Sequence, residues 1–341
     1  DQSSTFSSTV TFVASAGTIA AVTINDSNAL DLKALTTTGN LTVTAGGAVT
    51  DSGTLVIPGT ATISASGQAI TLDESSNNFG TLAVTGANVA VTDTNAIILG
   101  AATVTGTYGI TAGGAVTDSG TQEITGVTTI SASGQNVTLD TATNNFADEV
   151  RITGAAITLV DEDAIDLGAS TVSGTYTLTA GGAVTDTGAL AITGVTTIAA
   201  GSGNNITLDH TSNNFQAAVI VTSGNNVTLV DAGAIDLGAS TVSGTYTVTA
   251  GGAVTDSGTQ EIAGVTTIAA GSGNNITLNT STNNFAAAVV ITSGNNVTLV
   301  DEDAINLGAS TVSGTYTLTA GGEITDTGAL AITGVTTIAA G

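Results

Sequence analysis

The sequence predicts an all-β fold, a single-stranded parallel β-helix (β-solenoid). Three observations support this prediction. Two short motifs recur every 67–70 residues through the whole chain. Apolar residues alternate with threonine, which is the period of a strand with one buried face. Glycine, asparagine and aspartate interrupt the chain every few residues, so no stretch of helical length is available. Self-similarity at a fixed period is typical of solenoids, in which each unit packs only on its neighbours.

Two motifs fix the phase of the repeat. The Ala-Gly-Gly motif starts at Ala45, Ala112, Ala180, Ala250 and Ala320. The Asn-Asn-Phe motif starts at Asn77, Asn144, Asn213 and Asn283. The two series give the same period, so the chain has one repeat and not two overlapping ones.

One 70-residue unit, starting at Thr196, divides into pieces of 29, 20 and 21 residues. Each piece carries about three short strand signals, as one rung of a parallel β-helix requires. We therefore expect three rungs per unit and about 14 rungs in the chain. Residues 1–341 then form one continuous solenoid. Its expected repeat units are 1–58 (partial), 59–125, 126–195, 196–265, 266–335 and 336–341, the start of a further unit.

The composition excludes several classes of function. The formal net charge is −25, from 27 acidic residues against only Lys33 and Arg151. Nucleic acids and anionic lipid surfaces need clustered basic side chains, so we expect neither as a partner. Without cysteine there are no disulfides or thiolate metal sites. No apolar run is long enough to cross a bilayer, so membrane insertion is not expected.

The aromatic residues recur with the repeat, which indicates a structural role in the core or at corners. They are Phe79, Phe146, Phe215, Phe285, Tyr108, Tyr176, Tyr246 and Tyr316. With three rungs between equivalents, the rings would lie roughly 14 Å apart, too far to stack on one another. Ligand stacking is the alternative. His210 stands alone at a variable turn position, so catalysis or metal binding by it is not expected.

Carboxylates are the remaining candidates for chemistry. One series of aspartates follows Ala-Gly-Gly and a second recurs in the next rung: Asp51, Asp118, Asp186, Asp256 and Asp326, then Asp93, Asp161, Asp231 and Asp301. Aspartates at such places commonly bind backbone amides within a turn. The alternative is a calcium site within one loop, for which the candidates are Asp161, Glu162, Asp163, Asp301, Glu302 and Asp303. Calcium is the only possible cofactor.

Enzyme activity is not expected. Glycoside cleavage needs a pair of carboxylates in a cleft, and no cleft is indicated. Asparagine pairs such as Asn204-Asn205 and Asn225-Asn226 fall at corners. They are interpreted as turn residues that adopt left-handed backbone or stack as side-chain ladders.

The repeats NNITLDHTSNNFQAAVIVTSG, NNVTLVDAGAIDLGASTVSG and TYTVTAGGAVTDSG resemble those of very large bacterial exoproteins similar to filamentous haemagglutinin. The resemblance covers nearly the whole chain. It implies a right-handed parallel β-helix that is exported through an outer-membrane partner and acts in adhesion or biofilm formation.

Two functional hypotheses follow. The first is a structural extracellular fibre or stalk at the bacterial cell surface, stacked end to end with further repeats or copies of itself. The second is a module that binds a glycan, mineral or ice through threonine-rich faces. Ice binding would need Thr-x-Thr on every rung, whereas the rung of Thr228 offers only that one threonine.

Overall fold

The structure, a computed structural model, describes residues 10–12 and 17–341. They fall into two compact units, which divide between Ile165 and Asp166. Both units are parallel β-solenoids, and the described residues contain no helix, so the predicted fold class is confirmed. The chain makes about 16 turns and not the expected 14. The right-handed sense of the coil stays an expectation.

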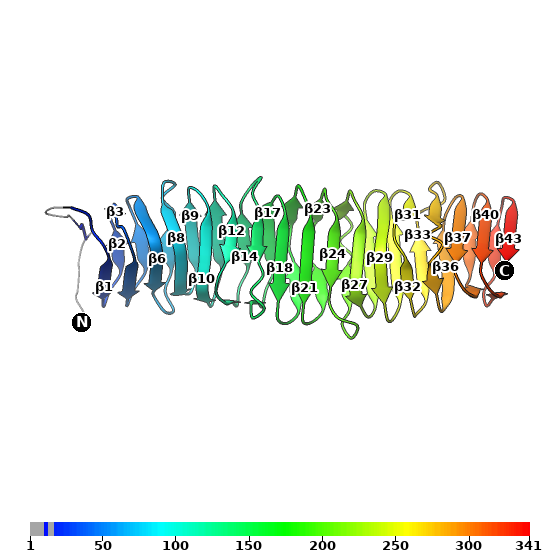
Figure 1. Cartoon of the computed structure of the whole chain (residues 1–341), viewed down its shortest axis with the longest axis horizontal. Helices are drawn as coiled ribbons and strands as arrows, with labels where there is room; N and C mark the ends of the chain where they lie inside the picture. The colour runs from blue at the N-terminus through cyan, green and yellow to red at the C-terminus, as the bar shows by residue number, and fades with distance from the viewer. Residues whose placement is uncertain (1–9, 13–16) are drawn as a thin grey trace. The chain divides into compact units, whose positions relative to one another are not determined.

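Three parallel ladders build the N-terminal unit, whose strands run from blue to green in Figure 1. The first ladder contains β1 (Val22–Asp26), β4 (Leu41–Ala45), β13 (Gln122–Ile124) and β16 (Asn145–Phe146). The second contains β2 (Leu30–Leu32), β5 (Val49–Asp51), β7 (Ile70–Leu72), β9 (Val89–Asp93), β11 (Tyr108–Ala112), β14 (Thr128–Ser131) and β17 (Val150–Gly154). The third contains β3 (Leu35–Thr36), β12 (Val116–Asp118), β15 (Val137–Leu139) and β18 (Ile157–Asp161). Three long strands, β6 (Leu55–Ser64), β8 (Asn78–Gly86) and β10 (Ile97–Val104), bend from the third ladder into the first.

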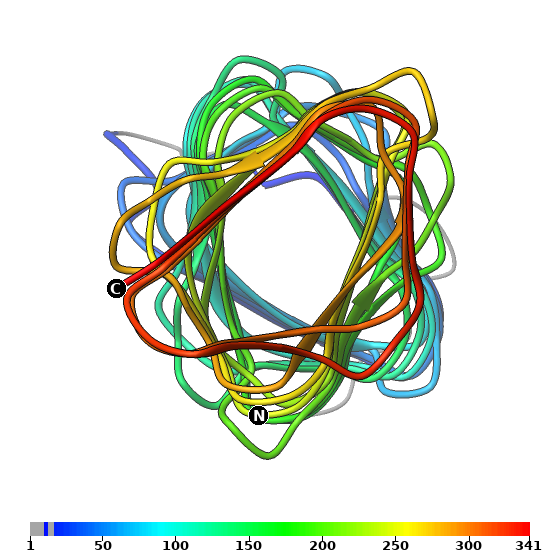
Figure 2. The same cartoon turned by 90° about the vertical axis from the view of Figure 1, so that its right-hand side faces the viewer.

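The C-terminal unit repeats this plan, and Figure 2 shows its last turns, orange to red, as three-sided loops. One ladder contains β22 (Val184–Asp186), β25 (Ile206–Leu208), β28 (Val227–Asp231), β30 (Tyr246–Ala250), β33 (Thr266–Ala269) and β36 (Ala288–Ser293). The first two residues of β36 also pair with β38 (Ile305–Leu307), which pairs with β41 (Ile324–Asp326). A second contains β21 (Tyr176–Ala180), β24 (Thr196–Ala199) and β27 (Val219–Gly224), and continues through the second half of β29 (Ile235–Val242) into β32 (Gln260–Ile262) and β35 (Asn284–Phe285). A third contains the first half of β29, β31 (Val254–Asp256), β34 (Ile276–Leu278), β37 (Val297–Asp301), β40 (Tyr316–Ala320) and β43 (Thr336–Ala340). The remaining pairings join β20 (Ser170–Val172), β23 (Leu190–Ile192) and β26 (Asn214–Phe215), and β39 (Ser310–Val312) and β42 (Leu330–Ile332). Strand β19 (Ile165–Leu167) runs across the boundary of the two units.

Alternation of side chains explains why these segments form strands. In β28, Val227, Leu229 and Asp231 are buried, whereas Thr228 and Val230 are half-buried on the outer side. The inner side chains are mostly valine, isoleucine and leucine, which suit a pleated and half-buried surface. Parallel pairing with the turns before and after satisfies the backbone of each strand.

One repeat makes three and one-third turns, and not the three whole turns expected. Ten strand segments lie between Val89 and Ile157 when the two halves of β10 are counted separately, and each turn uses three segments. Equivalent residues therefore move to the next ladder in each repeat. Val22 lies in the first ladder of the N-terminal unit, Val89 in the second and Ile157 in the third. In the C-terminal unit, Val227 and Val297 likewise lie in different ladders.

The recurring aromatic residues lie in the core. All eight phenylalanine and tyrosine markers are at most 1% exposed, and they are the largest fully buried side chains among the described residues. Because the repeat is not a whole number of turns, equivalent rings point inward from different ladders. The expected arrangement, with equivalent rings three whole turns and roughly 14 Å apart, is therefore wrong.

Candidate functional site

The most regular polar feature is a buried hydrogen bond between an aspartate and the first asparagine of Asn-Asn-Phe, one turn later. Asn77 donates from Nδ2 to Oδ2 of Asp51 at 2.5 Å. Asn144, Asn213 and Asn283 repeat this bond to Asp118, Asp186 and Asp256 at 2.7, 2.6 and 2.6 Å. All four asparagines are 0% exposed. A buried amide with so regular a partner is a built feature of the repeat.

The same asparagine also binds the backbone of the preceding turn. Oδ1 of Asn77 accepts the amide of Leu55 at 2.8 Å. Oδ1 of Asn213 accepts the amide of Leu190 at 2.9 Å. The aspartate in turn accepts backbone amides beside the asparagine, as Asp186 does from Asp209 at 2.9 Å. At this corner, the asparagine side chain and the aspartate carboxylate thus accept backbone amides that would otherwise need a partner in a strand.

A second aspartate extends the contact to the following turn. Oδ2 of Asp93 accepts the amide of Phe79 at 2.6 Å, and its Oδ1 accepts the amide of Asn95 at 2.9 Å. The same pair of bonds occurs at Asp161, Asp231 and Asp301. The expectation that recurring aspartates bind amides within a turn is thus correct for this series, but each also binds the turn before it.

We call these three residues and their bonds the three-turn clamp. The four clamps are Asp51–Asn77–Asp93, Asp118–Asn144–Asp161, Asp186–Asn213–Asp231 and Asp256–Asn283–Asp301. Sequence reasoning recorded every member as a recurring residue but did not connect them. The constant separation of 26–27 residues between the first aspartate and the asparagine was the signal that could have revealed the pair.

Burial changes the acidity of the clamps. It raises the pKa of six aspartates above the ordinary value, because the charged form loses water: Asp51, Asp93, Asp161, Asp186, Asp231 and Asp301. Hydrogen bonds from amides oppose this effect without cancelling it. Neither basic residue supplies a counter-charge, since Lys33 pairs with Asp31 and Arg151 pairs with Glu149.

The Ala-Gly-Gly corner lies directly on the turn made by the second clamp aspartate. The amide of Gly251 donates to the carbonyl of Asp231 at 2.9 Å. A Cβ atom on Gly251 would lie 2.2 Å from the carbonyl oxygen of Ala232, and one on Gly252 would lie 2.8 Å from the amide nitrogen of Ala234. Neither glycine has a positive φ. Close approach of two backbones, and not a left-handed conformation, therefore requires glycine here.

Asparagine pairs at another corner form a short side-chain ladder. Oδ1 of Asn205 accepts both the amide and the Nδ2 of Asn226, at 3.2 and 3.1 Å. Oδ1 of Asn226 accepts the amide of Thr245 at 3.0 Å. Among the residues that the structure describes, only glycines have positive φ. The ladder interpretation of these asparagines is therefore correct, and the left-handed interpretation is wrong.

Threonines on the outer face form in-register columns, which we call threonine ladders. Strand pairing places Thr185, Thr207, Thr228, Thr247 and Thr267 in one column of the C-terminal unit. A second column contains Thr255, Thr277, Thr298, Thr317 and Thr337. These side chains are half-buried or exposed. Their hydroxyl-bearing carbons repeat at the strand spacing of about 4.8 Å.

Each threonine ladder is one column wide. The next outward position beside Thr228 is Val230, and beside Thr247 it is Thr249. Next to Thr267 it is Ala269. The two-column Thr-x-Thr array that ice binding would need is therefore interrupted, as the sequence indicates.

The residues proposed for calcium occupy two different kinds of position. Asp161 and Asp301 are buried clamp members, and both oxygens of each carboxylate already accept amides. Glu162 and Asp163 are exposed and face Asn145 Nδ2, each at 3.5 Å. Glu302 and Asp303 are exposed at the equivalent turn. Within residues 10–12 and 17–341, no three acidic or histidine side chains are grouped as a metal site.

His210 lies beside a clamp but not in it. Its backbone amide donates to the Asp186 carboxylate at 3.3 Å, and its Nδ1 accepts the amide of Ser212 at 3.2 Å. Arg151, on the outer face of β17, pairs with Glu149, the residue just before that strand.

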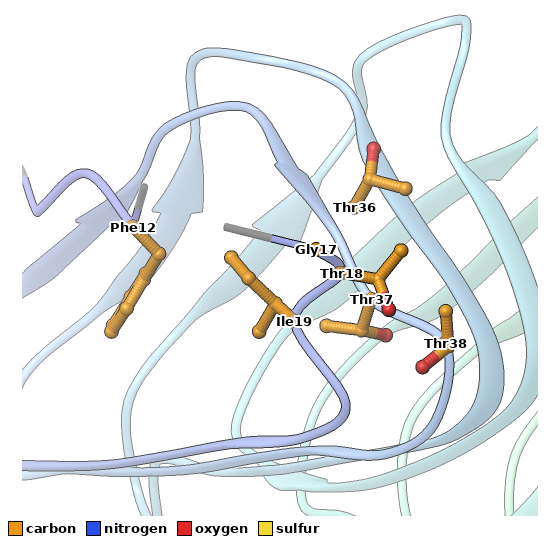
Figure 3. A pocket seen from close by; sticks show the side chains of 7 residues that line it. All are labelled: Phe12, Gly17, Thr18, Ile19, Thr36, Thr37 and Thr38. Carbon is orange, nitrogen blue, oxygen red and sulfur yellow. The ribbon is translucent and has the colours of Figure 1, made fainter. Parts of the chain in front are cut away.

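A hollow of about 380 Å³ opens in the N-terminal unit near the start of the described chain. Figure 3 shows Phe12 and Ile19 on one side and Thr36, Thr37 and Thr38 on the other. Its lining has no ionisable side chain, so it offers no acid, base or metal ligand. Among the described residues, no helix has the length and apolar composition that crossing a bilayer requires.

Comparison with known proteins identifies the repeat. Five consecutive segments match the family described as repeats of unknown function (DUF5649), at residues 19–85, 86–153, 154–222, 224–292 and 294–341. The chain is thus a β-solenoid repeat protein, and it belongs to this family. No curated protein and no solved structure matches it.

Proposed function

We propose that this chain is a structural segment of a large secreted bacterial protein, a fibre or stalk that supports adhesion, biofilm or filament formation. The observation that carries the proposal is the three-turn clamp. Each repeat uses its recurring buried polar residues to hold successive turns together, as in Asp186, Asn213 and Asp231. In a solenoid each repeat contacts only its neighbours, so bonds that join successive turns support a repeat whose role is to extend the chain.

The surface supports the same proposal. A net charge of −25 with two basic residues keeps a β-rich surface from associating sideways, because like charges repel. Because the chain has no cysteine, its stability comes from stacking and does not depend on the redox state of its surroundings. The resemblance to haemagglutinin-like exoproteins supplies the proposed location at the cell surface.

Electron microscopy of chains with different repeat numbers tests the proposal. Removal of one whole repeat, residues 224–292, deletes three and one-third turns. We expect particles that are shorter by about 16 Å, at about 4.8 Å per turn, with unchanged width. In the parent bacterium, the same deletion should keep the protein on the surface and weaken attachment. Particles whose length does not follow the repeat number would contradict the proposal.

The threonine ladders favour a second candidate, a module that binds an extended glycan or a mineral face. Five hydroxyls in one column present a regular row of donors and acceptors. Sedimentation with insoluble polysaccharides and minerals tests this candidate. Replacement of Thr228 and Thr247 by valine should abolish binding, whereas replacement of Thr241, outside the column, should not.

A further inference from the structure

The strands of a threonine ladder are close copies of one another. Strands β22, β25, β28, β30 and β33 each place an outward threonine between two buried side chains. If β25 paired with β30 and skipped β28, the same kinds of side chain would meet on both faces. Hydrophobic patterning therefore does not select the correct partner turn in this ladder.

The clamp does distinguish the turns, because it occurs once per repeat. Asp186, Asn213 and Asp231 belong to three successive turns and bind only in that order. A slip of one turn would leave the Asn213 side chain, which is 0% exposed, without its carboxylate. It would also leave the buried amide of Phe215 without its acceptor. An unpaired buried polar group costs far more than a hydrogen bond gains, so a slipped stack is strongly disfavoured.

We propose that the three-turn clamp sets the register of the solenoid, by making each repeat stack its turns in only one order. Hydrogen bonds suit this task because they are short and directional, whereas apolar contacts between near-identical strands are interchangeable. A single buried polar residue fixes the register of coiled coils in the same way. The clamp is thus a conformational device of the repeat, whether the whole protein is a fibre or a binding module.

Disulfide trapping in the full chain tests the proposal directly. The chain has no cysteine, so an introduced pair reports one contact only. Thr228→Cys with Thr247→Cys reports the native register, since these residues are strand partners. Thr207→Cys with Thr247→Cys reports a one-turn slip, since Thr207 natively pairs with Thr228. Each pair is refolded from denaturant under oxidising conditions.

We expect the native pair to form and the slipped pair to remain at trace level. In an Asn213→Ala background, the slipped disulfide should rise at least tenfold. Asn214→Ala is the matched control, because this neighbouring asparagine is exposed and outside the clamp. If the slipped disulfide stays at trace level with Asn213→Ala, the clamp adds stability only and the proposal is overturned. Should that variant not fold, the same measurement on Asp186→Asn, which keeps the side-chain size, decides the question.

Discussion

Asn213 donates from Nδ2 to Oδ2 of Asp186 at 2.6 Å, across 27 residues of sequence and one turn of the solenoid. Both residues are buried, and neither is paired with Lys33 or Arg151, which pair with Asp31 and Glu149. The bond therefore replaces the ion pair with which many proteins satisfy a buried carboxylate. In the clamps of this chain, amides perform the role that arginine and lysine side chains often perform for buried carboxylates.

Removal of the Asn213 side chain should destabilise the protein far more than removal of the neighbouring Asn214 side chain. Asn213→Ala leaves the Asp186 carboxylate and the Leu190 amide without their partner, so we expect a loss of about 2–3 kcal/mol in the free energy of unfolding. Asn214→Ala should change it by less than about 0.5 kcal/mol, as is usual for an exposed side chain. Chemical denaturation of the two variants measures the difference, and equal effects would contradict a clamp role.

The Ala-Gly-Gly corner should not accept a methyl group. Gly251→Ala places Cβ 2.2 Å from the Ala232 carbonyl oxygen, so the two backbones must separate. We expect a loss of about 1–3 kcal/mol, as for other overpacked sites. Gly273→Ala is the control, because nothing lies within 4 Å of its Cβ position. Thermal melting compares the two, and a Gly251→Ala variant as stable as Gly273→Ala would show that the corner has room.

Removal of the Tyr108 hydroxyl should not weaken the fold. The oxygen is buried and has no hydrogen-bond partner, so Tyr108→Phe removes an unsatisfied polar atom while keeping the ring. We expect unchanged or higher stability, since deletion of an unpaired buried group is neutral or favourable. Phe146→Ala, which removes a buried ring, should cost about 3–5 kcal/mol. A clear loss with Tyr108→Phe would reveal a bond to the hydroxyl.

Acid should stabilise the protein over a defined range. Burial raises the pKa of six of the eight clamp aspartates above the unfolded value of about 3.9, so the folded state binds protons more tightly. This contribution is complete below the unfolded pKa and is lost as the pH rises through the folded pKa. The free energy of unfolding should therefore fall between pH 4 and neutrality. Repetition in 1 M salt, which screens surface repulsion, isolates the buried groups. Stability that rises with pH would mean that amide hydrogen bonds outweigh burial.

Calcium should leave the stability unchanged. Both carboxylate oxygens of Asp161 and of Asp301 already accept backbone amides, so a calcium ion would have to displace those bonds. We expect the same melting temperature in millimolar calcium and in excess chelator. A higher melting temperature in calcium would restore the acidic turns at Glu162 and Glu302 as a calcium site.

The fold class could be predicted because a solenoid is dictated by local signals. Alternation in segments such as Ile206–Leu208 fixes strands with a buried face, and the period of 67–70 residues fixes stacking. The number of turns per repeat was predicted wrongly. It depends on which strand pairs with which, and near-identical strands such as β25 and β28 offer several partners with the same pattern.

The clamp was only half visible in the sequence. Asn213 and Asp186 were recognised as recurring residues, but their contact depends on the length of the turn between them. The threonine columns could not be predicted for the same reason. Only the strand register shows that Thr185 and Thr267 belong to one column. In this protein, the spacing of residues along the chain predicts the strands. The hydrogen-bonded contacts between turns depend on the strand pairing, which the spacing does not reveal.

Each repeat makes three and one-third turns, so equivalent residues of successive repeats lie on different sides of the coil. In the N-terminal unit, Val22, Val89 and Ile157 occupy three different sides of the coil. Within the N-terminal unit, a tag or epitope inserted at the same position of three successive repeats would thus be displayed on three different sides of the coil. The same surface feature therefore faces each of the three sides of this unit in turn, once per repeat.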